Sequence, residues 1–320
     1  MHRIGVLTSG GDAPGMNAAI RAVVRKGLYR GYEVLGIKRG FAGLIEGDIL
    51  PLGAGSVADV IRAGGTILLT ARSEEFLTPE GRAQAFASIR RAGIDGLVVI
   101  GGDGSLKGAL TLHRETELPL VCIPATIDND IPGTDFAIGF DTAINNVVDA
   151  INKIRDTATS HERTFVVEVM GRNSGHIALA AGLAGGAESI LVPELPFDPD
   201  AVCRRLLRGV RRGKLHSIIL VAEGAGSAAE VAREIKSRTG FDTKITVLGH
   251  IQRGGAPTAF DRLLASMMGA RAVDLLEAGE RKAVVGVSGY YLKHYDLEQV
   301  FEMKKEIDKE LYRLAEVLAI

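Results

Sequence analysis

The sequence predicts an open α/β fold of two Rossmann-like three-layer α/β/α domains, with mostly parallel sheets and the active site in the cleft between the domains. Three observations lead to this prediction. The chain has 320 residues, more than one average domain. Short apolar runs rich in Val and Ile alternate with longer amphipathic stretches. Many of its 40 glycines stand directly after those runs, which is typical of strand-to-helix turns.

The apolar runs are continuous rather than alternating, so we expect parallel strands that are buried on both faces. They span residues 3–8, 33–37, 96–100, 120–123, 164–170, 217–222, 245–248 and 283–287. Two helices are expected from apolar stripes of helical period. The first covers residues 141–159, and the second closes the chain, with Met303, Ile307, Leu311, Leu314 and Leu318 on one side. One domain should contain residues 1–139 and 253–304, the other residues 140–252 and 305–320.

Composition excludes several classes of protein. A net charge of -1 argues against a broad surface for nucleic acid or an anionic membrane. Cys122 and Cys203 lack a metal-ligand spacing, which favours reduced thiols in a cytoplasmic protein. The apolar runs are too short to span a bilayer, and no signal peptide is recognised.

Glycine-bearing turns follow four of the strands, and a polar loop follows a fifth. They cover residues 9–15, 101–105, 171–175, 249–255 and 124–130. Ligands of open α/β sheets bind beyond the carboxyl ends of strands, so these segments should converge on one site. Gly10-Gly11 and Gly101-Gly102 would let phosphates approach backbone N–H groups, and the helices that follow add their positive ends. Neither a Walker loop nor a G-x-G-x-x-G motif is present, and each single turn can also be read as a tight connection.

Three of the acidic residues in these turns are candidates for chemistry. Asp103 would repel bound phosphates unless Mg²⁺ intervened, held largely by the phosphates of the donor. The alternative for Asp103 is a helix N-cap. Asp128 and Asp130 follow a buried strand, where a carboxylate can accept a hydroxyl proton as a general base. The alternative for these two is an Asx-turn that shapes the loop.

Basic side chains in loops would complete such a site, because guanidinium groups match phosphate oxygens. They are Arg72, Arg163, Arg172, His250 and Arg253. Singly, each is expected to be a solvated surface residue, but Arg172 and Arg253 stand next to the glycine turns. Met170 and Glu223 also end strands, with core packing and a surface carboxylate as alternatives. Together these features predict transfer of a phosphoryl group from a magnesium-bound donor to the hydroxyl of a small anionic acceptor.

With these motifs assembled, the chain resembles the bacterial ATP-dependent 6-phosphofructokinases over almost its whole length. Residues 8–17, 101–105, 126–130, 160–163, 170–172 and 248–255 carry the resemblance. It implies an ATP-binding first domain and a sugar-phosphate-binding second domain. It also implies a cytoplasmic homotetramer of glycolysis with shared active and effector sites, binding neither nucleic acid nor membrane.

The resemblance also implies residue roles. ATP would contact Gly11, Arg72, Ser73, Gly102, Asp103, Gly104 and Ser105, with Asp103 near Mg²⁺. Asp128 would take the proton of the 1-hydroxyl of fructose 6-phosphate beside Thr126 and Asp130, and Arg172 would stabilise the phosphoryl group in direct in-line transfer. The sugar phosphate would contact Thr126, Ile127, Asp128, Arg163, Met170, Gly171, Arg172, Glu223, Lys244, His250, Ile251, Gln252 and Arg253. Of these, Arg163 and Lys244 would come from a neighbouring subunit.

A regulatory site for ADP or phosphoenolpyruvate is implied in the same way. Its residues would be Arg21, Arg25, Asp59, Arg155, Gly186, Glu188, Arg212, Lys214 and His216. From the residues alone, a solvated basic face is the alternative. Leu215 stands where relatives often carry Lys, and Ala54 offers no charge, so the sign and strength of regulation stay open.

Three other functions compete with this one. A pyrophosphate-dependent phosphofructokinase is disfavoured by Gly104 and Ala125, where such relatives tend to carry Asp and Lys. A nucleotide-sensing module without catalysis is disfavoured by the intact Asp103, Asp128 and Arg172. A dehydrogenase is disfavoured because the dinucleotide motif is missing.

Lys244 replaces an Arg of many relatives, which retains charge but loses bidentate geometry.

Overall fold

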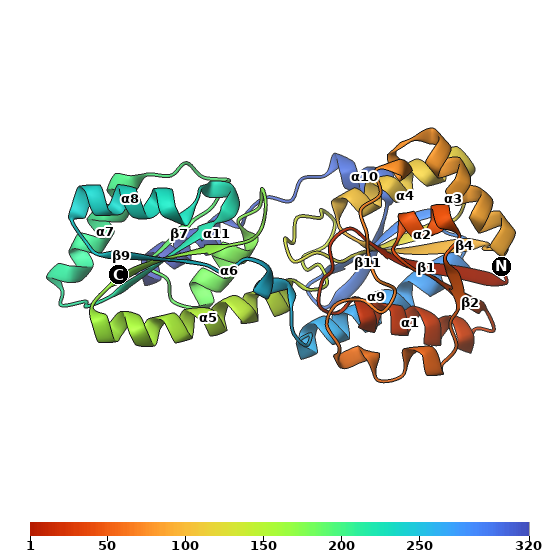
Figure 1. Ribbon diagram of the computed structural model, residues 1–320, viewed down its shortest axis with the longest axis horizontal. Helices are drawn as coiled ribbons and strands as arrows, with labels where there is room; N and C mark the ends of the chain where they lie inside the picture. Colours follow the sequence, from red (N-terminus) through yellow and green to blue (C-terminus); the bar gives the residue numbers. More distant parts are fainter. Residues whose placement is uncertain (320) are drawn as a thin grey trace. The chain divides into compact units, whose positions relative to one another are not determined.

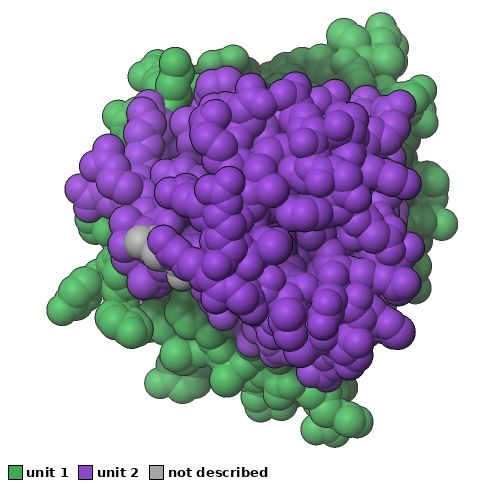
Figure 2. Space-filling model, turned by 90° about the vertical axis from the view of Figure 1, so that its left-hand side faces the viewer, with its two compact units in different colours: residues 1–142, 253–305 green, residues 143–252, 306–320 purple. Residues whose placement is uncertain are grey.

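The computed structural model describes residues 1–319, and these divide into two compact units. The first unit consists of residues 1–142 and 253–305, and the second of residues 143–252 and 306–319 (Figure 2). The chain therefore passes between the units three times. Within residues 1–319, no helix combines the length and apolar character that crossing a lipid bilayer requires.

A seven-stranded sheet forms the first unit, in the order β11-β10-β5-β4-β1-β2-β3. Its strands are β1 (Arg3–Ser9), β2 (Glu33–Ile37), β3 (Ile49–Pro51), β4 (Gly96–Gly101), β5 (Leu120–Pro124), β10 (Lys282–Ser288) and β11 (Tyr291–Asp296). The two edge strands, β3 and β11, run antiparallel to their neighbours, and the five strands between them are parallel. The parallel strands are almost entirely buried, as their continuous apolar sequences predict.

Helices cover both faces of this sheet (Figure 1). One face carries α1 (Met16–Tyr29) and α9 (Ala259–Glu277), which pack against each other. The other carries α2 (Phe41–Glu46), α3 (Pro79–Ala92), α4 (Asp103–Thr116) and α10 (Leu297–Glu302). Three short 3₁₀ turns complete the unit: η1 (Gly55–Val57), η2 (Val60–Arg62) and η3 (Glu75–Leu77). Thr78 starts α3 by accepting the N–H of Gly81 at 3.1 Å, and Gly93 ends it in a left-handed conformation.

The second unit has a four-stranded parallel sheet in the order β7-β8-β6-β9. Its strands are β6 (Thr164–Val169), β7 (Ser189–Leu191), β8 (Ser217–Ala222) and β9 (Thr243–Val247). Helices α7 (Pro199–Arg211) and α8 (Ala228–Thr239) cover one face, and α5 (Phe140–His161) and α6 (His176–Ala184) the other (Figure 1). The final helix, α11 (Lys309–Leu318), packs against α6 and β7, while η4 (Glu223–Ala225) and η5 (Gly249–Arg253) follow β8 and β9.

The predicted class, with three-layer α/β/α units and mostly parallel sheets, is confirmed. Two expectations are wrong. The strand at residues 245–248 was expected to be buried on both faces, but β9 is an edge strand whose Ile245 and Val247 are 48% and 59% exposed. The closing helix was expected to include Met303 and Ile307, but it begins only after Asp308, whose carboxylate caps it by accepting the N–H of Leu311 at 2.8 Å.

Candidate functional site

The turns after β1, β4 and β5 leave the same edge of the first sheet. Ser9 pairs with Gly101, and Gly101 pairs with Pro124, so the three strands end level with one another. A Cβ atom on Gly102 would lie 3.6 Å from Cβ of Thr126. A Cβ atom on Gly101 would lie only 2.5 Å from the carbonyl oxygen of Ser9. The close approach of these turns therefore requires glycine at position 101.

The turn at Gly10-Gly11 is fixed from two sides. Gly10 has φ 86°, and its carbonyl accepts the hydroxyl of Thr70 at 2.8 Å. Arg253 donates to the carbonyl of Asp12 at 3.0 Å, and a Cβ atom on Gly11 would lie 2.6 Å from Nη1 of Arg253. The structure thus brings Arg253 to the glycine turn of β1.

Arg72 and Ser73 lie in the loop that follows Thr70. The Arg72 side chain is exposed. The Ser73 hydroxyl accepts the N–H of Phe76 at 3.2 Å and so supports the first turn of η3.

Asp103 occupies the first turn of α4, but it does not cap that helix. The N-cap position belongs to Gly102, and the Asp103 carboxylate lies 2.7 Å from Nζ of Lys107 and is 46% exposed. No group of three or more His, Cys, Asp or Glu side chains able to hold a metal occurs in residues 1–319. A cation at Asp103 would therefore need phosphate and water oxygens as its remaining ligands, which suits Mg²⁺.

The loop after β5 buries Asp128, which is 2% exposed. The N–H of Asp128 donates to the hydroxyl of Thr126 at 3.2 Å. Asn129 adopts a left-handed conformation with φ 51°, which Asn tolerates better than most residues. Its amide donates to the carbonyl of Asp135 at 3.0 Å and accepts the N–H of Ala137 at 2.8 Å. These bonds close the loop that carries Asp128, and Thr126, at the start of that loop, lies beside Gly102.

In the second unit, the loop after β6 is held by two acceptors. One oxygen of Glu223 accepts the N–H groups of Gly171 and Arg172 at 3.2 and 2.7 Å. The amide oxygen of the fully buried Gln252 accepts the N–H of Met170 at 3.2 Å. Glu223 therefore has a structural role that a solvated surface carboxylate would not have. Gly171 and Arg172 both have positive φ, 138° and 52°, so the loop bends sharply just before the Arg172 side chain.

Arg163 and Lys244 lie together at the start of β6 and on β9, and both pair with Asp242. The distances from Asp242 Oδ2 are 3.1 Å to Arg163 Nε and 3.2 Å to Lys244 Nζ. His250 and Ile251 are exposed in η5, whereas Ile127, the residue before Asp128, is fully buried. The structure thus gathers Arg163 with Lys244, and Met170–Arg172 with Glu223 and Gln252.

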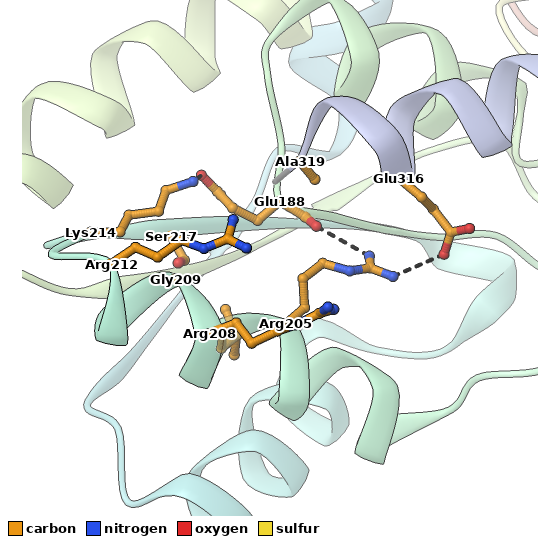
Figure 3. Close-up of a pocket in the computed structure, with 10 residues that line it drawn as sticks. Glu188, Arg205, Arg208, Gly209, Arg212, Lys214, Ser217, Glu316 and Ala319 are labelled. Atoms are coloured by element: carbon orange, nitrogen blue, oxygen red, sulfur yellow. Dashed lines mark hydrogen bonds and ion pairs between the residues drawn. The ribbon is translucent and has the colours of Figure 1, made fainter.

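A second candidate site is a basic pocket of about 170 Å³ between α7 and α11 (Figure 3). Four cations and two acids line it: Arg205, Arg208, Arg212, Lys214, Glu188 and Glu316. Glu188 is 5% exposed, pairs with Lys214, and accepts the N–H of Ile218. Arg205 donates to the carbonyl of Glu188 at 3.2 Å and to the carboxylate of Glu316 at 2.9 Å. The excess of cations favours the binding of an anion in this pocket.

Further predicted effector residues surround Glu188. Arg155 donates to the carbonyl of Gly186 at 3.1 Å. The His216 ring lies 3.2 Å from the hydroxyl of Thr159, and burial lowers the pKa of His216 against the opposing pull of Glu188. Arg21, Arg25 and Asp59 belong to the first unit, where η2, which follows Asp59, packs on α1.

Sequence reasoning missed three charged residues of this pocket, Arg205, Arg208 and Glu316. Their charges lie on amphipathic helices whose exposed faces are ordinarily solvated. The only sequence signal was the density of Arg along α7, whose sequence is PDAVCRRLLRGVR.

The sheet order and the glycine turns at one edge define an open α/β protein of the phosphate-binding class. Comparison with known proteins makes this specific, since the phosphofructokinase family model matches residues 3–276. The chain is 61% identical to an ATP-dependent 6-phosphofructokinase of Halalkalibacterium halodurans and 57% identical to one of Halothermothrix orenii, covering 100% of each. It is also similar to a phosphofructokinase structure from Saccharomyces cerevisiae, with 36% identity and a TM-score of 0.91 over 100% of this chain and 48% of that one. The chain belongs to the phosphofructokinase family.

Proposed function

We propose that the chain transfers the γ-phosphoryl group of ATP to the 1-hydroxyl of fructose 6-phosphate, with Asp128 as general base. The observation that carries this proposal is the buried Asp128 in the loop after β5, whose N–H donates to Thr126, the residue that lies beside the Gly102 turn that opens α4. The hydroxyl oxygen attacks the γ-phosphorus, its proton passes to the Asp128 carboxylate, and the bond from the γ-phosphorus to the bridging oxygen of ADP breaks. No covalent phosphoenzyme is needed.

The nucleotide is proposed to bind along the edge formed by Gly11, Gly102–Ser105 and the loop at Arg72. The N-terminal end of α4 directs backbone N–H groups and a positive dipole at phosphate oxygens. A bound Mg²⁺ would neutralise part of the phosphate charge, and the Asp103 carboxylate would be its single protein ligand. Lys107 would then exchange its contact with Asp103 for solvent or phosphate.

The sugar phosphate is proposed to be held by Met170, Gly171, Glu223, His250 and Arg253, with Arg172 stabilising the phosphoryl group in transfer. Arg163 and Lys244 would serve the 6-phosphate of a neighbouring subunit in a homotetramer. Support for such an assembly comes from β9, an edge strand with unpaired backbone groups and the exposed apolar side chains of Ile245 and Val247. A cytoplasmic location remains a prediction.

Steady-state turnover with a choice of donor tests this function. We expect fructose 1,6-bisphosphate to form with fructose 6-phosphate and ATP but not with pyrophosphate. Turnover with pyrophosphate alone would support the pyrophosphate-dependent alternative. Calorimetric binding of ATP without any turnover would instead support a nucleotide-sensing module.

Regulation by an anionic effector is proposed at the basic pocket of the second unit, with Arg155, Gly186, Glu188, Arg212, Lys214 and His216 as its ligands. Arg21, Arg25 and Asp59 would belong to the same site across a subunit interface. The test is the dependence of rate on fructose 6-phosphate with and without ADP or phosphoenolpyruvate. Lys214→Met should abolish the effector-induced shift while leaving the unregulated rate unchanged. An undiminished shift would contradict this assignment.

A further inference from the structure

Lys305 is a partly buried lysine on the segment that joins α10 to α11, where the chain leaves the first unit. Its ammonium donates to the carbonyl of Thr134 at 2.8 Å and to the carbonyl of Asp135 at 3.2 Å. Burial lowers the pKa of Lys305 to about 8, although the nearby carboxylates of Asp135 and Asp130 act in the opposite direction. A lysine is rarely buried in this way without a specific partner.

The carbonyl of Asp135 connects Lys305 to the Asp128 loop. It accepts the amide of Asn129 at 3.0 Å as well as the ammonium of Lys305. Asn129 stands directly between Asp128 and Asp130 and is 4% exposed. A displacement of the Asp135 carbonyl would therefore also displace Asn129, the residue that directly follows Asp128.

The same segment is fastened on its other side to β10. The N–H of Asp135 donates to the carbonyl of Val287 at 2.8 Å, and the hydroxyl of Thr134 accepts the N–H of Val287 at 3.0 Å. The Asp135 carboxylate accepts the N–H of Gly289 at 2.7 Å. Residues 134 and 135 are thus held by the sheet on one side and by Lys305 on the other.

We propose that Lys305 is a positioning residue for the Asp128 loop, holding the Thr134 and Asp135 carbonyls and offsetting the charge of Asp130. This proposal rests on the proposed role of Asp128. A positively charged donor at this point bonds two carbonyls more strongly than a neutral one. It also reduces the negative charge that an incoming phosphate would meet next to Asp128 and Asp130.

Substitution separates the bond, the charge and the bulk of the side chain. Lys305→Met keeps the aliphatic stem but removes both bonds, and we expect kcat to fall by about 10–100-fold because the base is misplaced. The KM for ATP should stay within about twofold, since the Gly102 turn does not depend on this contact. Lys305→Arg, which keeps charge and donors, should restore most of kcat. The exposed neighbour Lys304, replaced by Met, is the matched control and should leave kcat unchanged.

The pH profile provides a readout that a purely structural role would not move. Asp130 and Asp135 are the charged groups that face the ammonium. Because Lys305 is charged below a pKa of about 8 and neutral above it, kcat of the wild type should fall as pH rises through that value. Lys305→Arg should lose this decline, because its guanidinium stays charged. An unchanged decline in Lys305→Arg would overturn the role of charge.

Asp128→Asn, measured in parallel, separates the two proposals. If Asp128→Asn abolishes turnover while Lys305→Met retains wild-type kcat, the Lys305 proposal is wrong and the base assignment stands. If Asp128→Asn is fully active, the base assignment is wrong, and the Lys305 proposal, which rests on it, is wrong as well. Thermal melting of each variant identifies those that fail to fold, and a folded Lys305→Gln then decides the question: it should show intermediate kcat, because it keeps a neutral donor.

Discussion

Asp261, at the start of α9, accepts two hydrogen bonds from Thr142 in the first turn of α5: one from its backbone N–H at 2.8 Å and one from its hydroxyl at 2.5 Å. The other carboxylate oxygen accepts the N–H of Gly139, also at 2.8 Å. Asp261 is completely buried. One carboxylate therefore satisfies the backbone N–H groups of Gly139 and Thr142 at the beginning of α5, where the helix offers them no carbonyl acceptor.

Asp261→Asn should lower the free energy of unfolding by about 2 kcal/mol, because the amide NH₂ would face the N–H donor of either Gly139 or Thr142 in a buried place. Urea unfolding followed by circular dichroism measures this. Asp274→Asn serves as the control, since Asp274 makes only partly exposed ion pairs with Lys26 and Arg30, and its substitution should cost under about 1 kcal/mol. An equal loss of unfolding free energy in the two variants would show that the burial of Asp261 does not add to its effect on stability.

Asp128→Asn should lower kcat by about 10²–10⁴-fold, since the amide cannot accept the hydroxyl proton. The KM for fructose 6-phosphate should remain close to that of the wild type, because the change preserves shape. Steady-state kinetics on the folded variant checks both values. Near-normal kcat would rule out Asp128 as the base.

Gly104→Asp should raise the KM for ATP by about tenfold or more, because a second carboxylate beside Asp103 repels the nucleotide phosphates. The protein itself should tolerate the change. Gly104 is exposed. Among the described residues, a Cβ atom at this position would meet no heavy atom within 4 Å other than those of its chain neighbours and the nearby backbone of α4. Gly104→Ala adds the methyl group without charge and should keep the KM for ATP within about twofold. If both variants lose ATP affinity equally, bulk rather than charge is responsible.

Gly224→Ala should impair catalysis through Arg172. A Cβ atom on Gly224 would lie 2.0 Å from the carbonyl oxygen of Arg172, so the loop after β6 must move. We expect kcat to fall by about 10²-fold, as for other displaced catalytic groups. A double-mutant cycle with Arg172→Ala measures the coupling. Additive losses in kcat would show that Gly224 acts by another route, and Gly53→Ala, which meets open space, controls for the loss of a glycine.

The fold was predictable because buried parallel strands have continuous apolar sequences, and all eight expected strands are present. The three missed strands give weak signals. β3 and β7 have only three residues each, and β11 is a largely exposed edge strand of polar residues, YLKHYD. Turn chemistry identified the segments around Asp103 and Asp128. It could not reveal Lys305 or Arg205, whose partners Thr134 and Glu316 lie far away in sequence and whose partial burial only tertiary structure creates.

The order of strands in the first sheet has a consequence for synthesis on the ribosome. β10, from Lys282 to Ser288, fills the place between β5 and β11, yet residues 143–252 of the second unit are translated before it. While they emerge, β5 stands as a bare sheet edge, and its apolar residues have no neighbour on that side. In a nascent chain that stalls in this interval, the unpaired edge of β5 can pair with strands of other chains and cause aggregation. The need of the folding chain for chaperones should therefore be greatest before residue 282 is made.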